Sequence, residues 1–248
     1  YSAVWNMHSD DGELINGSIE KRKKLRVLQI YENSLTIINP ALNHCFSLTE
    51  LVLCGKISID LSQITGLINL RNLHLMCEKK RRTCKDYKYT EFINLTTINT
   101  FNALQKLCVY GDNITDLMLP DSCHLSNLSE LKIYGVRCSQ SVLDAPELLD
   151  LQTDKCMFVL GSLHKFTKLN VFKFIGGDAV AFKMPSLPIT KLNVHTWDLH
   201  LLDAESIPVL DKLEIVNTAG NNLMDFVRNF KNLRVIEWYD YCNKPVLD

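Results

Sequence analysis

The chain has 248 residues, of which 46% are hydrophobic and 22% are charged, and its net charge is −1. These values are typical of a folded soluble protein, and a charge this small excludes a global field attracting nucleic acid or a membrane surface. The longest apolar runs are a few residues, too short to span a membrane. No secretory leader opens the chain, and its first residue is Tyr1, so we expect a fragment or a processed chain.

Residues 1–24 precede the first repeated element and end in the basic run Lys21–Lys24. The acidic residues Asp10, Asp11 and Glu13 lie before that run. Acidic residues near the start and basic residues near the end predict a short helix. We interpret residues 1–24 as a capping segment that covers the apolar end of the domain that follows.

From residue 25 onwards one short phrase recurs ten times: an apolar residue, two others, an apolar residue, one other and an apolar residue. The clearest copy, Leu25–Leu35, fits LxxLxLxxNxL at every fixed position. All but two of the steps between copies span 20 to 29 residues. The copies begin at Leu25, Leu48, Leu70, Leu104, Leu128, Pro146, Leu169, Ile189, Leu210 and Leu233.

The alternation within each phrase predicts a strand whose apolar side chains point inward. A single strand of this kind cannot bury its apolar face, so the strands are expected to stack into a continuous, moderately curved parallel sheet. The rest of each repeat returns on the other side as short helices or turns. In the sixth repeat, the inward pair is predicted to be Leu149 and Leu151.

The phrase resembles the leucine-rich repeat, and the irregular repeats of this chain resemble those of intracellular F-box leucine-rich-repeat proteins. The resemblance implies an α/β solenoid over residues 25–248, with a curved parallel β-sheet on the concave face and short helices or turns on the convex face. It also implies a non-enzymatic module that binds a protein partner on the concave face, as the substrate-recognition part of a ubiquitin-ligase adaptor. Contact with the ligase scaffold would then need upstream sequence.

An insertion over residues 78–99 lengthens the third step and is locally basic. It is interpreted either as a solvated loop or as an arm that contacts phosphate or an acidic partner through Arg81 and Arg82. The basic residues of this loop are Lys79, Lys80, Arg81, Arg82, Lys85 and Lys88.

The nine cysteines form no CxxC pair, and several occupy apolar repeat positions. We therefore expect reduced thiols and a cytoplasmic or nuclear protein, with Cys77 and Cys84 as the exception if a disulfide forms. Four N-x-S/T sequons weakly favour the alternative of a secreted or cell-surface leucine-rich-repeat receptor ectodomain. They begin at Asn16, Asn94, Asn113 and Asn127.

The position after each inward pair holds four of the eight tyrosines and several apolar residues. Aromatic residues favour strands in general. A row of them on an open sheet face, however, indicates an interaction surface. The next row inward adds Lys132 and Lys173, which would make the centre of the surface basic. The predicted partner-binding residues are Tyr31, Met76, Tyr110, Lys132, Tyr134, Lys173, Ile175, His195 and Tyr239.

No catalytic motif, metal site or cofactor motif is recognised, so an enzyme is the least favoured class. A third alternative is a scaffold subunit of a chromatin or centromere assembly that uses the basic loop. Dedicated nucleic-acid binding is not expected from a single basic loop in a chain of net charge −1.

Overall fold

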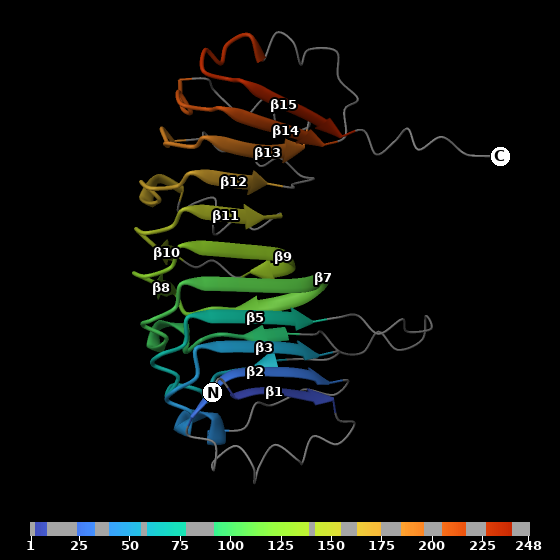
Figure 1. The fold of residues 1–248 in the computed structure, drawn as a ribbon, viewed down its shortest axis with the longest axis vertical. Coiled ribbons are helices and arrows are strands. Elements are labelled where there is room, and N and C mark those ends of the chain that lie inside the picture. Colours follow the sequence, from blue (N-terminus) through green and yellow to red (C-terminus); the bar gives the residue numbers. More distant parts are fainter. Residues whose placement is uncertain are drawn as a thin grey trace, which may run out of the picture.

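The structure is a computed structural model that describes residues 3–8, 24–32, 40–55, 59–77, 92–138, 142–154, 163–174, 185–195, 205–216 and 227–239. In these residues the chain forms a parallel β-solenoid, with one strand of each coil stacked on the next (Figure 1). Ten repeats predict ten strands, and a strand lies at each predicted place. An eleventh strand, β1, precedes them.

Every neighbouring pair in this stack is parallel. The strands follow one another in chain order: β1 (Ala3–His8), β2 (Leu25–Glu32), β3 (Glu50–Gly55), β5 (Asn72–Cys77), β7 (Lys106–Met118), β9 (Glu130–Cys138), β11 (Asp150–Thr153), β12 (Val171–Phe174), β13 (Lys191–His195), β14 (Lys212–Val216) and β15 (Val235–Tyr239).

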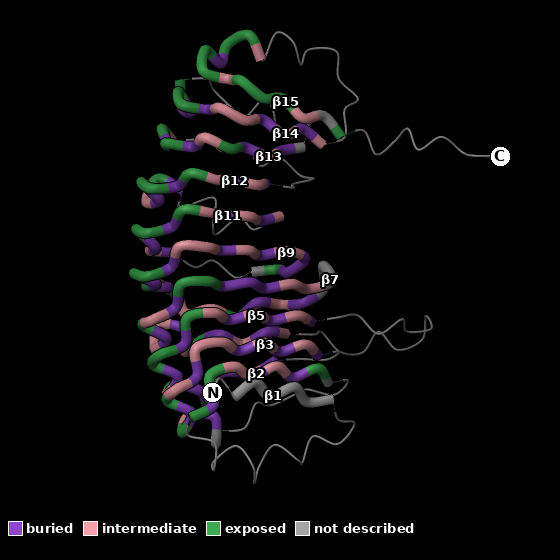
Figure 2. Tube along the Cα trace, viewed as in Figure 1, coloured by how far each residue is buried: buried purple, intermediate pink, exposed green. Residues whose placement is uncertain are grey.

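Alternate residues of each strand point into one continuous core, as the period-two pattern predicts. The first inward position is at most 3% exposed from Leu28 in β2 to Leu213 in β14. In the last described coil the equivalent residue, Ile236, is 44% exposed, because no other described strand is stacked on the far side of β15. Figure 2 shows the same change from buried to exposed at β15.

Each coil approaches its strand through a series of tight turns with a buried residue at every third position. In the third coil, which leads to β5, these residues are Leu61, Ile64, Leu67 and Leu70, and two N–H groups donate to the carbonyl three residues earlier. Three such segments are 3-10 helices: η1 (Pro40–His44), η2 (Ile98–Thr100) and η3 (Leu163–Lys165). Turns therefore predominate over helices, and none of the described helices is long and apolar enough to cross a membrane.

A second, shorter group of paired strands, called the second sheet below, is joined to the first through the bent strands β7 and β9 and is not predicted by the repeat pattern. It contains β4 (Ile59–Asp60), β6 (Phe92–Asn94) and the second halves of β7 and β9. A separate parallel pair consists of β8 (Ser122–His124) and β10 (Val142–Asp144). The register between β7 and β9 shifts after Tyr110, where both strands turn from the first sheet into the second.

The two predicted segments outside the repeats are only partly described. Ala3–His8 is a strand that extends the sheet beyond β2, and residues 9–23, over which the helix is expected, lie outside the described residues. Residues 78–91 of the insertion also lie outside them, with all six basic loop residues. Residues 92–99 form β6 and part of η2, and their side chains Ile93, Leu95 and Ile98 are buried, so this end of the insertion belongs to the core.

The predicted register of the sixth repeat is wrong. Leu151 pairs with Leu131 and Phe172, and Thr153 pairs with Ile133 and Phe174, so Leu151 and Thr153 form the inward pair. Leu149 is 48% exposed. The turn residue equivalent to Leu128 is the buried Leu148, not Pro146, and this assignment gives steps of 20 and 21 residues on its two sides. The apolar pattern failed here because a threonine occupies a core position.

Candidate functional site

The side chains that do not enter the core form an open face of three rows across the first sheet. The third row, farthest along each strand, holds most of the predicted binding residues. At one end of it Tyr31, Cys54, Met76, Tyr110 and Tyr134 are consecutive partners, and at the other end His195, Val216 and Tyr239 are. Ile175 lies outside the described residues, and only the backbone of His195 is described.

The middle row holds the predicted residues Lys132 and Lys173. The strand pairing places Gln152 between them, so Gln152 lies in the middle row and not in the third row where the sequence pattern placed it. Asp150 correspondingly lies in the first row. The structure thus brings Tyr31, Met76, Tyr110 and Tyr134 into one row, and separates them from Tyr239 by the width of several strands.

Tyr110 and Tyr134 are held at the point where β7 and β9 bend. Each precedes a glycine, and a Cβ atom on Gly111 would lie 2.6 Å from the Gly135 carbonyl oxygen. Gly135 has a φ of 64°, in the left-handed region that favours glycine. The two bends coincide, so the tyrosine rings stack with centroids 5.5 Å apart and planes 18° apart.

Contacts from the next coil fix this tyrosine pair. The Tyr134 hydroxyl donates to Gln152 Oε1 at 3.1 Å, and the Gln152 amide donates to both carboxylate oxygens of Asp150 at 3.1 and 3.2 Å. The Gly135 N–H donates to Asp154 Oδ1 at 2.8 Å. Burial raises the pKa of both tyrosine hydroxyls, so they stay protonated at neutral pH. The pair therefore presents a rigid aromatic surface with an ordered polar border.

The surface beside the tyrosine pair, over β2, β3 and β5, is poor in charge. Its third row consists of Tyr31, Cys54 and Met76, and the middle row contributes Val52. Among the outward-facing residues that pair across these three strands, Glu50 is the only Asp, Glu, Lys or Arg. Tyr31 is 38% exposed. This part of the open face is suited to covering by an apolar partner surface.

The centre of the open face is not basic, contrary to the expectation for Lys132. Glu130 lies between Lys132, 2.5 Å away, and Lys106, 3.0 Å away. Burial acts to raise the pKa of Glu130, but hydrogen bonds from Lys132 and Lys106 outweigh it and hold that pKa below its usual range. Burial raises the pKa of the neighbouring Asp150. The charges at this point are internally compensated, because two lysines face two carboxylates.

We expect Glu130→Gln to lower the free energy of unfolding by about 1 kcal/mol at pH 7, because two lysines lose their charged partner. The folded-state pKa of Glu130 is depressed, so its contribution is present above the unfolded-state pKa of about 4.3 and is lost as the pH falls through the folded-state value. Urea unfolding of both proteins at pH 7 and near pH 3 measures this. A difference that is equal at both pH values would contradict the ion-pair assignment.

At the C-terminal end of the open face, two carboxylates share one lysine. Lys212 lies 2.8 Å from both Glu214 and Glu237, and the Tyr239 hydroxyl donates to Glu237 at 2.9 Å. Asn193 donates to Glu214 at 2.6 Å. Lys173, by contrast, forms no ion pair within the described part of the chain. Of the two lysines predicted for the open face, Lys173 is thus the one without an ion pair to another described residue.

The described cysteines are thiols, and none of them forms a disulfide: Cys45, Cys54, Cys77, Cys108 and Cys123. Cys84 lies outside the described residues, so the predicted exception is untested. Burial raises the pKa of the Cys108 thiol, which disfavours its thiolate and hence its use as a nucleophile. The described residues contain no group of three or more His, Cys, Asp or Glu side chains placed to hold a metal ion.

Three side chains of β8 and β10 form a hydrogen-bonded chain that was not predicted from the sequence. Ser122 Oγ lies 3.0 Å from His124 Nε2, and His124 Nδ1 lies 3.3 Å from Asp144 Oδ2. Strand alternation puts Ser122 and His124 on one face, but only the β8–β10 register adds Asp144. The order matches a hydrolase triad. However, the His124 side chain is 64% exposed, whereas such triads act in water-excluded sites with oxyanion donors. We interpret this chain as a link between two coils.

No family model matches the chain, and no curated protein matches it. Among solved structures, it is similar to an internalin, InlF, of Listeria monocytogenes. The identity is 14%, the match covers 89% of this chain and 77% of the internalin, and the TM-score is 0.31. Backbones related at this level do not superpose closely, so the fold assignment rests on the chain's own strand ladder.

Proposed function

We propose that this solenoid is a non-enzymatic recognition module that binds a protein partner on its open face. The observation that supports the proposal best is the stacked Tyr110–Tyr134 pair, held rigid at the strand bends and continuous with the charge-poor surface of Tyr31, Cys54 and Met76. Rigid tyrosines bury a large area at a low cost in conformational entropy, which makes them frequent hot spots of protein interfaces.

Replacing both Tyr110 and Tyr134 with alanine is expected to weaken partner binding by about 2 kcal/mol or more. The measurement is affinity capture from cell extract, with the recovered proteins quantified by mass spectrometry for the parent chain and the variant. The matched control replaces Met118, at the end of β7, and Val142, at the start of β10, with alanine. These residues are 44% and 46% exposed and are not part of the open face.

A partner that is lost with the tyrosine variant and retained with the control supports the open face as the binding surface. If all three proteins recover the partner equally, the partner binds outside the open face. Thermal unfolding of each variant shows whether a lost interaction reflects the surface or the fold, since the aromatic stack also packs β7 against β9.

We further propose that the module selects substrates for a ubiquitin ligase in the cytoplasm or nucleus. Support comes from the irregular repeats, which resemble those of F-box leucine-rich-repeat proteins, and from the described thiols. Capture with the full-length parent protein should then recover ligase scaffold subunits together with candidate substrates. Recovery of chromatin proteins or cell-surface ligands without a ligase subunit would contradict this role and favour the corresponding alternative.

A further inference from the structure

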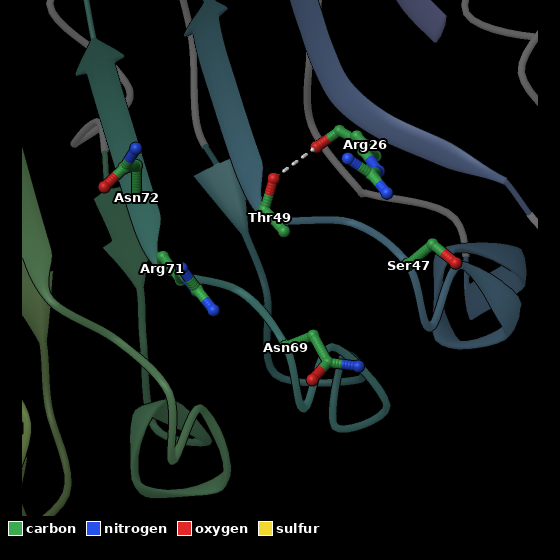
Figure 3. A pocket seen from close by; sticks show the side chains of 6 residues that line it. All are labelled: Arg26, Ser47, Thr49, Asn69, Arg71 and Asn72. Atoms are coloured by element: carbon green, nitrogen blue, oxygen red, sulfur yellow. Dashed lines mark hydrogen bonds between the residues drawn. The ribbon is translucent and has the colours of Figure 1, made fainter. Parts of the chain in front are cut away.

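The molecule is hollowed where β2, β3 and β5 begin, at the opposite end of these strands from the tyrosine row. This hollow has a volume of about 500 Å³, and the described residues that line it are all polar: Arg26, Ser47, Thr49, Asn69, Arg71 and Asn72 (Figure 3). Arg26, Thr49 and Arg71 occupy the same register position in three successive coils, since each directly follows the buried residue that ends the turn.

Hydrogen bonds between coils fix the walls of this hollow. Thr49 Oγ1 donates to the Arg26 carbonyl oxygen at 3.1 Å, drawn as a dashed line in Figure 3. Asn69 Nδ2 donates to the Phe46 carbonyl oxygen at 2.7 Å. The N–H groups of Arg71 and Asn72 both donate to the Thr49 carbonyl oxygen, at 2.9 and 3.0 Å. A ligand would therefore meet a preformed frame, which lowers the entropic cost of binding.

Neither Arg26 nor Arg71 has a carboxylate partner within the described residues. The same corner of later coils is neutralised: Arg234, in the equivalent position, bonds Asp211 at 2.5 and 2.9 Å, and Lys168 lies 2.6 Å from Glu147. In the hollow, the coil between the two arginines supplies the neutral Thr49. Glu50 follows Thr49, but its carboxylate accepts from Gln29 on the open face. Among the described residues, no carboxylate compensates either guanidinium group.

The spacing of these groups suits one doubly charged oxyanion. Adjacent strands lie about 4.8 Å apart, so the backbones of Arg26 and Arg71 are separated by roughly 10 Å, a span two arginine side chains can close on one ligand. Guanidinium forks bind phosphate oxygens in a bidentate manner. Two such cations match the charge of a phosphate monoester, whereas a single carboxylate would leave one charge uncompensated.

We propose that this hollow binds a phosphate monoester carried on a larger molecule, with Arg26 and Arg71 holding the phosphate and Ser47 and Asn72 supplying neutral hydrogen bonds. A volume of about 500 Å³ leaves room for the group that bears the phosphate. The site goes beyond the proposed protein-binding function and does not depend on it. The phosphate comes either from a phosphorylated side chain of a protein or from a small phosphorylated molecule.

The test is calorimetric titration of the protein with phenyl phosphate at low ionic strength. Saturable binding to one site is expected, with a dissociation constant of about 1 mM or lower. Arg26→Gln and Arg71→Gln should each weaken it about threefold to tenfold, because the contacts are charged but exposed. Arg71→Lys should fall between them and the parent, since lysine keeps the charge and loses the fork.

Arg234→Gln is the matched control, because it removes the equivalent arginine at a neutralised corner and should leave binding unchanged. Benzoate, which carries a single charge, should bind about tenfold more weakly than phenyl phosphate. Three results would each overturn the proposal: no saturation with phenyl phosphate below about 10 mM, binding by the Arg26 and Arg71 variants that is as tight as that of the parent protein, or binding of benzoate that is as tight as that of phenyl phosphate. Circular dichroism and thermal unfolding confirm that each variant is folded.

A second arm identifies the source of the phosphate with a short phosphoserine peptide and its unphosphorylated form. A peptide affinity about tenfold or more above that of phenyl phosphate indicates a phosphorylated protein. Equal affinities of the peptide and phenyl phosphate indicate a small phosphorylated molecule. Binding of the unphosphorylated peptide as tightly as the phosphorylated one would contradict recognition of phosphate.

Discussion

Replacing Leu151 with alanine is expected to lower the free energy of unfolding by about 3 kcal/mol or more. Leu151 is fully buried between Leu131 and Phe172 of the neighbouring coils, and truncation would leave a cavity that the stacked strands cannot close. Urea unfolding followed by circular dichroism measures the change.

Leu149→Ala is the matched control, and its expected effect is below about 0.5 kcal/mol, because Leu149 is 48% exposed. The sequence pattern predicts the opposite for this residue, since it places both Leu149 and Leu151 in the core. If the two substitutions lowered the free energy of unfolding by similar amounts, the register predicted from the sequence, which begins at Pro146, would be correct. A large loss for Leu151 alone would confirm the register read from the strand pairing.

Gly66→Ala is expected to destabilise the fold by about 3 kcal/mol, through steric overlap alone. A Cβ atom at this position would lie 2.3 Å from the Asn43 carbonyl oxygen and 2.9 Å from its Cα, and backbone atoms cannot move aside cheaply. The Asn43 side chain draws the two coils together, because its Oδ1 accepts from the N–H groups of Thr65 and Gly66, both at 2.7 Å. Thermal unfolding measures the loss.

Thr65→Ala is the matched control, because it introduces an alanine next to Gly66 without placing a new Cβ atom against Asn43. Thr65 is exposed and its backbone N–H keeps the bond to Asn43, so we expect a change within about 0.5 kcal/mol. If Gly66→Ala were as stable as the parent, the close approach of the second and third coils would be wrong. The position of the hollow lined by Ser47 and Asn69 in the same turns would then need revision.

Much of the row of tyrosines on the open face could be predicted from the sequence, because in a parallel stack the position of a residue in its repeat determines its place on the sheet. Each repeat holds its apolar residues at the same spacing, so the residue after an inward pair must join a row with its counterparts. This reasoning correctly aligned Tyr31, Met76, Tyr110 and Tyr134. It also anticipated ten strands and a continuous core without any knowledge of contacts between coils.

The charge of that surface could not be predicted in the same way. Lys132 belongs to the middle row and Glu130 to the first, and their compensation depends on side chains meeting within 2.5 Å. The tyrosine stack likewise depends on two coincident bends, one of which needs the left-handed backbone of Gly135. Distances of this kind follow from side-chain conformation, which composition and spacing do not specify.

The sequence by itself determined the repeat, the parallel stacking of strands and the row of tyrosines, because all three follow from the periodicity of apolar residues. Tertiary structure alone decided the register of the sixth coil, where Thr153 fills a core position, and the second sheet formed by the bent strands. It also decided which of the described charges have a partner, because Arg26 and Arg71 line one hollow on either side of a neutral coil, whereas Arg234 is hydrogen-bonded to Asp211. The physical reason is the same in all three cases: they depend on which residues pair between coils, and the spacing of residues along the sequence does not specify that pairing.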